Sequence, residues 1–77
     1  MMDPEGVKEL VMRAFPGATI EVTDLTGTFD HFQIQVVSPA FQDKKLVDQH
    51  RMVQASVQEA LADGRIHAIQ IKTSVPK

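Results

Sequence analysis

The sequence predicts one small α+β domain with the element order αββαβ, and three observations support that prediction. The chain has 77 residues, a length that provides a single hydrophobic core. Two segments repeat apolar residues at helical spacing, and three others alternate apolar with polar residues as strands do. No linker or internal repeat divides them, so residues 1–77 are expected to form a single domain.

The first helix is expected to begin at Asp3 and Pro4. Asp3 suits the N-cap, and Pro4 suits the first helical position, where no backbone N–H is needed. Pro16 and Gly17 then end the helix. One apolar stripe runs between these signals, formed by Val7, Leu10, Val11 and Ala14.

Two alternating segments, 18–23 and 31–36, predict an antiparallel hairpin. The polar segment 24–30 contains a glycine and supplies the connection between them. Threonine, glutamate and glutamine occupy the positions opposite the apolar ones, so the sheet is expected to have one open face. The buried face would carry Ala18, Ile20, Val22, Phe32, Ile34 and Val36.

A long helix is predicted from Lys45 to Ala62, with Gly64 suited to a left-handed cap. A short third strand follows around Ile69 and Ile71, parallel to the second strand if the two pair. The expected architecture is therefore a three-stranded mixed sheet with both helices on one face. The long helix would bury Leu46, Val47, Val53, Val57, Ala60 and Leu61.

Composition excludes several kinds of site. Without cysteine the chain has no disulfide, thiolate metal cage or thiol nucleophile. Its net charge of −2 opposes broad phosphate neutralisation. No apolar run approaches the roughly 20 residues that span a bilayer, and the first residues do not resemble a signal peptide. The expected location is the cytoplasm or its organellar equivalent, with no membrane partner.

The three histidines are the main candidates for metal binding or proton transfer. His31 opens the second strand on its polar side, a position that also suits a plain exposed histidine. His67 begins the third strand in phase with Ile69, and it suits either a ligand or a structural histidine at the sheet edge. The pleat predicts that His31 and His67 face opposite sides. His50, beside the apolar stripe of the long helix, is interpreted as structural.

No catalytic motif emerges, so an enzyme is not expected. The serines lack a nucleophile elbow, and the histidines lack the spacing of a zinc protease site. Asp30 adjoins His31, but neighbouring strand residues point to opposite faces and cannot form a pair. Lys44 and Lys45 precede a helix, where cations oppose the dipole and weakly indicate an anionic partner.

Three segments, taken in order and spacing, resemble the BolA-like family. They are residues 30–38 (DHFQIQVVS), 49–53 (QHRMV) and 65–73 (RIHAIQIKT), with Phe41 and Lys44 between the first two. The resemblance covers essentially the whole chain and implies an αββαβ domain related to the type II KH arrangement. It also implies a protein that shares a bridging [2Fe-2S] cluster with a monothiol glutaredoxin, in iron–sulfur cluster trafficking or iron homeostasis.

By this resemblance His67 matches the family's C-terminal cluster-ligand histidine. The glutaredoxin cysteine and a bound glutathione would supply the sulfur ligands, so the isolated chain is expected to carry no cofactor. It is expected to be a monomer alone and a heterodimer with its partner. Many members place a cysteine or histidine in the loop between the first two strands. Here residues 26–30 contain neither, which leaves His31 as the second candidate ligand.

Nucleic-acid binding is the alternative function, because family members have been linked to transcription and the fold is KH-related. Lys44, Lys45 and Arg51 would then be the contacts. The acidic balance of the chain opposes this alternative, as does the lack of the GxxG loop with which KH domains clamp the backbone.

Overall fold

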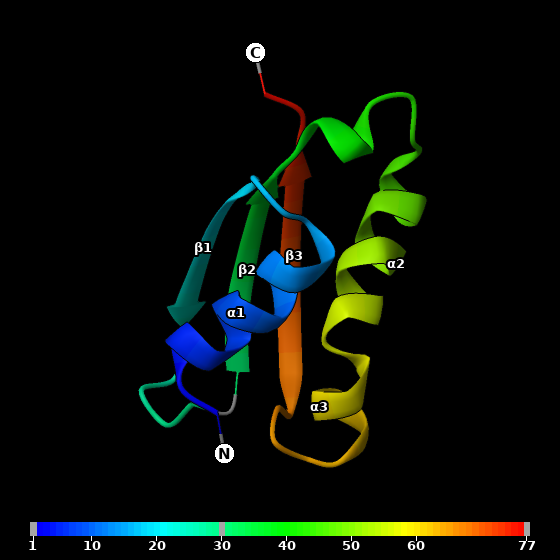
Figure 1. The fold of residues 1–77 in the computed structure, drawn as a ribbon. Helices are drawn as coiled ribbons and strands as arrows, with labels where there is room; N and C mark the ends of the chain where they lie inside the picture. The colour runs from blue at the N-terminus through cyan, green and yellow to red at the C-terminus, as the bar shows by residue number, and fades with distance from the viewer. Residues whose placement is uncertain (1, 30, 77) are drawn as a thin grey trace.

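The predicted order of elements is confirmed in a computed structural model, which describes residues 2–29 and 31–76 (Figure 1). The helix expected at 45–62 is divided in two, and a single 3₁₀ turn precedes it. The elements are α1 (Pro4–Ala14), β1 (Thr19–Asp24), β2 (His31–Val37), η1 (Pro39–Phe41), α2 (Leu46–Ser56), α3 (Gln58–Ala62) and β3 (Ala68–Ser74).

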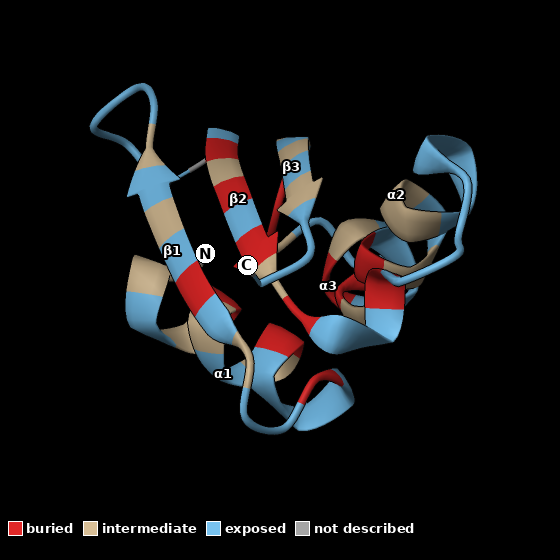
Figure 2. Cartoon of the chain, turned by 90° about the horizontal axis from the view of Figure 1, so that it is seen from above, coloured by how far each residue is buried: buried red, intermediate tan, exposed pale blue. Residues whose placement is uncertain are grey.

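The sheet has the order β1-β2-β3 and is mixed, as the sequence predicts. Strands β1 and β2 are antiparallel, with Ile20 opposite Val36. Strand β3 lies parallel to β2, with Ile71 opposite Ile34. Burial alternates along β1 and β2, so one face packs against the helices while the other is largely open to solvent (Figure 2). The relation to the type II KH arrangement stays a prediction.

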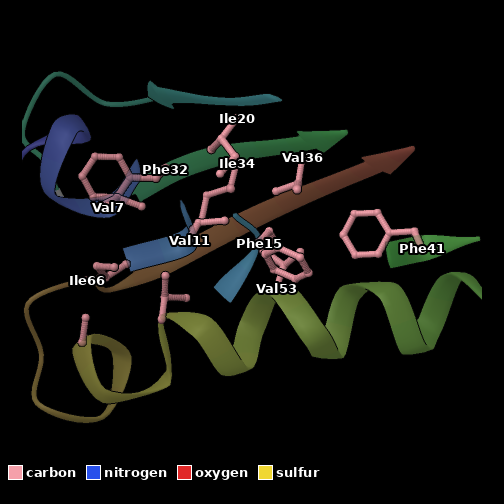
Figure 3. Close-up of a cluster of buried hydrophobic side chains, with 12 residues drawn as sticks. Val7, Val11, Phe15, Ile20, Phe32, Ile34, Val36, Phe41, Val53 and Ile66 are labelled. Carbon is pink, nitrogen blue, oxygen red and sulfur yellow. The ribbon is translucent and has the colours of Figure 1, made fainter. Parts of the chain in front are cut away.

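The core lies between the helices and the covered face of the sheet (Figure 3). Helix α1 begins as predicted, because the Asp3 carboxylate accepts a hydrogen bond of 2.8 Å from the Gly6 N–H. The rings of Phe15 and Phe41 meet with centroids 5.2 Å apart, which joins the end of α1 to η1. The buried apolar residues are Val7, Val11, Phe15, Ile20, Phe32, Ile34, Val36, Phe41, Val53, Val57, Ala60 and Ile66.

The prediction of one continuous helix from Lys45 to Ala62 is wrong at Val57. Val57 has φ −117° and ψ 11°, and its N–H bonds the Gln54 carbonyl instead of continuing the α-helical pattern. The Ser56 hydroxyl donates to the Val53 carbonyl at 2.5 Å, and such a bond competes with regular helix geometry. Helix α3 then lies beside the start of β3 (Figure 1).

Leu46 and Val47 were expected in the core, but the structure exposes 62% and 53% of them. Leu46 is in phase with buried Val53, yet it lies in the first turn of α2, where the helix extends past the packed layers (Figure 2). Helical phase alone therefore placed these side chains incorrectly. None of the helices within residues 2–29 and 31–76 is long and apolar enough to cross a membrane.

Side-chain hydrogen bonds tie three segments together where β2 and β3 end. The Gln49 amide N–H group donates to the Lys44 carbonyl at 2.8 Å, and its oxygen accepts from the Thr73 hydroxyl of β3. Ser38 is buried, and its backbone N–H donates to the Ser74 carbonyl at 3.0 Å. We call this set (Ser38, Phe41, Gln49 and Thr73) the closed end of the sheet.

Candidate functional site

His31 and His67 meet at the opposite end of the sheet, where β2 and β3 begin. Their ring centroids are 6.4 Å apart, and the ring planes are inclined by 77°, so one ring presents its edge to the other. Both residues are exposed. The β1–β2 turn and the α3–β3 loop lie together at this end of the molecule (Figure 1). We call it the histidine end.

The turn after β1 positions His31. The Asp24 carboxylate accepts backbone hydrogen bonds from Thr26 at 3.2 Å, Gly27 at 3.0 Å and Phe29 at 3.3 Å. Gly27 adopts φ 77° and Phe29 φ 61°, the left-handed conformation that closes such a turn. The Leu25 N–H then donates to the His31 carbonyl at 2.9 Å, so pairing of the two strands continues to the histidine.

The loop after α3 positions His67. Ile66 is buried in the core, and its N–H donates to the Ala60 carbonyl at 3.2 Å, which ties the loop to α3. Asp63 accepts from the Arg65 backbone N–H at 3.0 Å and from its Nε at 2.8 Å. The backbone N–H of Arg65 is the main cause of a lowered pKa at the Asp63 carboxyl. His67 follows directly after this anchored segment.

The prediction that His31 and His67 face opposite sides is wrong. In the parallel register His31 pairs with Ala68, and β3 begins at Ala68 instead of His67. The pleat therefore does not govern the His67 side chain, which is exposed. A residue just outside a strand is free to turn toward its neighbour, and here it turns toward His31.

A hollow of about 80 Å³ adjoins His31, lined also by Leu25, Phe32, Ala68, Ile69 and Gln70. Pockets that enclose small molecules are several times larger, about 300–1,000 Å³. Leu25 and Phe29 nearby expose 44% and 38% of their surface. The histidine end is thus an exposed imidazole pair with apolar neighbours, better suited to contact a second macromolecule than to enclose a substrate.

The donor set of the histidine end fits a shared metal centre. Two imidazoles whose rings lie edge to face can each present a nitrogen to a transition metal, the ligand type that suits zinc, copper and iron. No group of three or more histidine, aspartate or glutamate side chains within the described ranges could hold a metal ion. A metal held by this pair would therefore take its remaining ligands from another molecule.

The other candidates from the sequence do not join this pair. His50 is half-buried on α2. Lys44 and Lys45 are exposed just before α2, at the closed end, and Arg51 is exposed further along that helix. The interpretation of Asp30 beside His31 falls on a residue outside the described ones.

Sequence reasoning overlooked the two residues that position the histidines. Asp24 was assigned only to a polar connection, although an Asp three residues before Gly27 is typical of a turn closed by a carboxylate. Ile66 was not assigned to the core, yet it is 1% exposed. An isoleucine directly before His67 is the signal that could have identified the anchor of the loop.

Comparisons with known proteins agree on one family. The model of the BolA-like protein family matches residues 12–77. The chain is 33% identical over 73 residues to the uncharacterised protein RP812 of Rickettsia prowazekii, covering 94% of both chains. It is 37% identical to human BolA-like protein 3, covering 92% of this chain and 66% of the human one.

Solved structures give the same result. The BolA domain of SufE1 from Arabidopsis thaliana superposes with a TM-score of 0.82 at 29% sequence identity, covering 99% of this chain and 96% of that domain. The similarity therefore extends over the entire αββαβ domain, including the segments that carry both histidines.

Proposed function

This chain belongs to the BolA-like family, and on that premise we propose that it is a non-enzymatic partner of a monothiol glutaredoxin. The two proteins would share a bridging [2Fe-2S] cluster, as cargo in iron–sulfur cluster trafficking or as a signal in iron homeostasis. One observation carries the proposal: His31 and His67, on separate segments, bring their imidazole rings to 6.4 Å at an exposed end of the sheet.

The ligand chemistry supports this division of roles. A neutral imidazole can replace a thiolate on iron, and such replacement raises the reduction potential of a [2Fe-2S] centre. The chain contains no cysteine, so every thiolate would come from the glutaredoxin and from glutathione. His67 would be the principal ligand, and His31 stands close enough to be the second.

The surroundings of the pair suit a protein partner. Leu25 and Phe29 are exposed apolar side chains on the turn that carries His31. Burial of such side chains is a main source of affinity between proteins. A glutaredoxin that reached the histidines would cover this turn. The same surface would then provide both the metal ligands and the apolar contacts of the interface.

Cluster sharing should depend on pH. An imidazole binds a metal only in its neutral form, so the shared complex is expected to weaken on acidification. Thiolates of the partner titrate in the same direction. The pH response of the complex must therefore be compared with that of the glutaredoxin–glutathione cluster alone.

Reconstitution tests the proposal directly. The chain is mixed with a monothiol glutaredoxin, ferrous iron, sulfide and glutathione under anaerobic conditions, and the product is followed by size exclusion and visible circular dichroism. We expect a coloured species with one copy of each protein and a spectrum distinct from that of the glutaredoxin alone. Separate elution, with the spectrum of the glutaredoxin unchanged, would contradict the proposal.

A further inference from the structure

Strand β1 forms a free edge of the sheet. The other edge, β3, is flanked by α2, which reaches it through the bond between Gln49 and Thr73 (Figure 1). Helix α1 packs against β1 from the covered face (Figure 2), and Pro4, Glu5 and Lys8 of its first turns lie beside the outer edge of the strand. The outer backbone groups of β1 are therefore available to another strand.

The ladder identifies the backbone groups that point outward. The Leu25 N–H donates to the His31 carbonyl directly opposite, and this marks a hydrogen-bonded pair of the antiparallel ladder. Because such pairs alternate, Thr19, Glu21 and Thr23 bond β2. The bond from the Ser38 N–H to the Ser74 carbonyl is consistent with this assignment. It shows that the backbone groups of even-numbered residues along β2 point toward β3, which leaves those of the odd-numbered residues to pair with β1.

Three residues of β1 consequently direct both backbone groups away from the sheet: Ile20, Val22 and Asp24. Within the described residues, no backbone hydrogen bond outside the β1–β2 ladder involves these groups. Two of the devices that block a sheet edge are missing from β1, because the strand contains no proline and its register with β2 runs without a bulge; Glu21 and Asp24 are its charged residues. The unpaired backbone groups of such an edge are complementary to one chemical partner, an extended strand.

We propose that the partner strand is β1 of a second copy of this chain, paired antiparallel about a two-fold axis at Val22. Each Val22 then faces its counterpart, and Ile20 faces Asp24 of the second copy, so all three outward residues exchange both hydrogen bonds. Glu21 faces Thr23 of the second copy on the open side of the sheet. The register therefore places no like charges directly opposite each other.

The groove beside this edge is self-complementary in charge. A hollow of about 300 Å³ lies between α1 and β1, and both Glu5 and Lys8 line it together with residues 20–23. The two-fold axis brings the grooves of both copies face to face. Glu5 of each copy can then pair with Lys8 of the other. A six-residue strand is a short interface, so we expect a dissociation constant of about 0.1–1 mM.

This dimer departs from the sequence-based expectation of a monomer. It uses β1 and α1, whereas the proposed cluster ligands are His31 and His67 at the histidine end, and the two surfaces meet at Asp24 and Leu25. The tests of the dimer use the chain without metal or glutaredoxin, so either proposal can fail without the other.

A single introduced cysteine tests the register, because the natural chain has none. A hydrogen-bonded antiparallel pair holds its Cα atoms about 5.5 Å apart, within the range of a disulfide. We expect the Val22→Cys variant to form a covalent dimer under mild oxidation at millimolar concentration. The matched Thr23→Cys variant faces Glu21 of the second copy and should cross-link at least fivefold more slowly. Equal rates, or no Val22→Cys dimer from folded protein, would overturn the proposal.

Charge substitutions on the open face provide a test that leaves packing untouched. Thr23→Lys places a base opposite Glu21 of the second copy, and Thr23→Glu places an acid there. Sedimentation equilibrium should show two- to tenfold tighter association for the lysine variant and a similar weakening for the glutamate variant. Thr19→Lys and Thr19→Glu control for net charge, since Thr19 faces Leu25 in this register. A monomeric natural chain at millimolar concentration, or equal effects at both positions, would refute the dimer.

Discussion

The two ends of the sheet are built differently. At the closed end, a side-chain bond joins β3 to α2, a backbone bond joins Ser38, just after β2, to Ser74 of β3, and Phe41 is only 1% exposed. At the histidine end, the hydrogen bonds of Asp24 and Asp63 remain within their own loops, and both histidines are exposed. The closed end therefore joins elements that are distant in sequence. At the histidine end, each of two neighbouring loops is stabilised by hydrogen bonds of its own residues.

This difference separates stability from ligand access. Long-range contacts at the closed end hold the helices on the sheet, so changes there should be felt by the entire domain. Local bonds at the histidine end shape loops without covering their tips. A metal site shared with a partner would need ligands that the partner can reach, and the histidine end leaves both imidazoles exposed.

The largest expected contrast is between two phenylalanines. Phe41→Ala removes a buried ring that packs against Phe15 and should destabilise the domain by about 3–5 kcal/mol. Phe29→Ala, at the histidine end, should change stability by no more than about 0.5 kcal/mol. Urea unfolding measures both. Similar losses in the two variants would remove the distinction between the ends.

A smaller effect is expected where Gln49 connects α2 with β3. Gln49→Ala should cost about 1–2 kcal/mol, because it breaks the bonds to Thr73 and to the Lys44 carbonyl. A double-mutant cycle with Thr73→Val isolates the link between the two side chains. We expect a coupling of about 0.5–1.5 kcal/mol. A coupling near zero would mean that the two substitutions act independently.

The Asp24 carboxylate should affect the position of His31 more than it affects the free energy of unfolding. Asp24→Ala removes the acceptor of the turn and should cost only about 0.5–1 kcal/mol, since the released N–H groups can bond water. We expect the NMR resonances of His31 to shift while those of His50 stay in place. Unchanged His31 resonances in the folded variant would show that the turn does not position this histidine.

The smallest effect concerns pH. Hydrogen bonds from Arg65 lower the folded-state pKa of Asp63 below its ordinary value of 3.8. The carboxylate therefore stabilises the fold above about pH 3.8, and the contribution is lost as pH falls through the lower folded value. The difference in unfolding midpoint between the natural chain and Asp63→Asn should shrink below pH 3.8. A difference that stayed constant with pH would exclude this contribution.

The order of elements was predictable because the alternating strands and the start of α1 carry local signals. Ile20, Ile34 and Val36 alternate with polar residues and are buried as expected, and Asp3 caps α1. The exposure of Leu46 was not predictable, because helical phase does not reveal where the neighbouring layers end. The break at Val57 coincides with a hydroxyl–carbonyl bond of Ser56, and no apolar periodicity shows either feature.

The candidate site was only half predictable. The family resemblance singled out His67 and offered His31, which matches a strand-opening histidine of many members, as the second candidate because the loop before it contains no cysteine or histidine. Strict alternation then separated the two, because it assumed that β3 begins at His67. The strand begins one residue later, and that single residue decides whether the rings meet.

The central claim is that His67 binds a shared cluster with His31 beside it. The most direct measurement is the visible circular dichroism of the reconstituted glutaredoxin complex formed with His67→Ala, His31→Ala or His50→Ala. We predict a large spectral change for His67→Ala, a smaller one for His31→Ala, and the natural spectrum for the His50→Ala control on α2. An unchanged spectrum for a folded, glutaredoxin-bound His67→Ala chain would remove His67 from the ligand set and contradict the account.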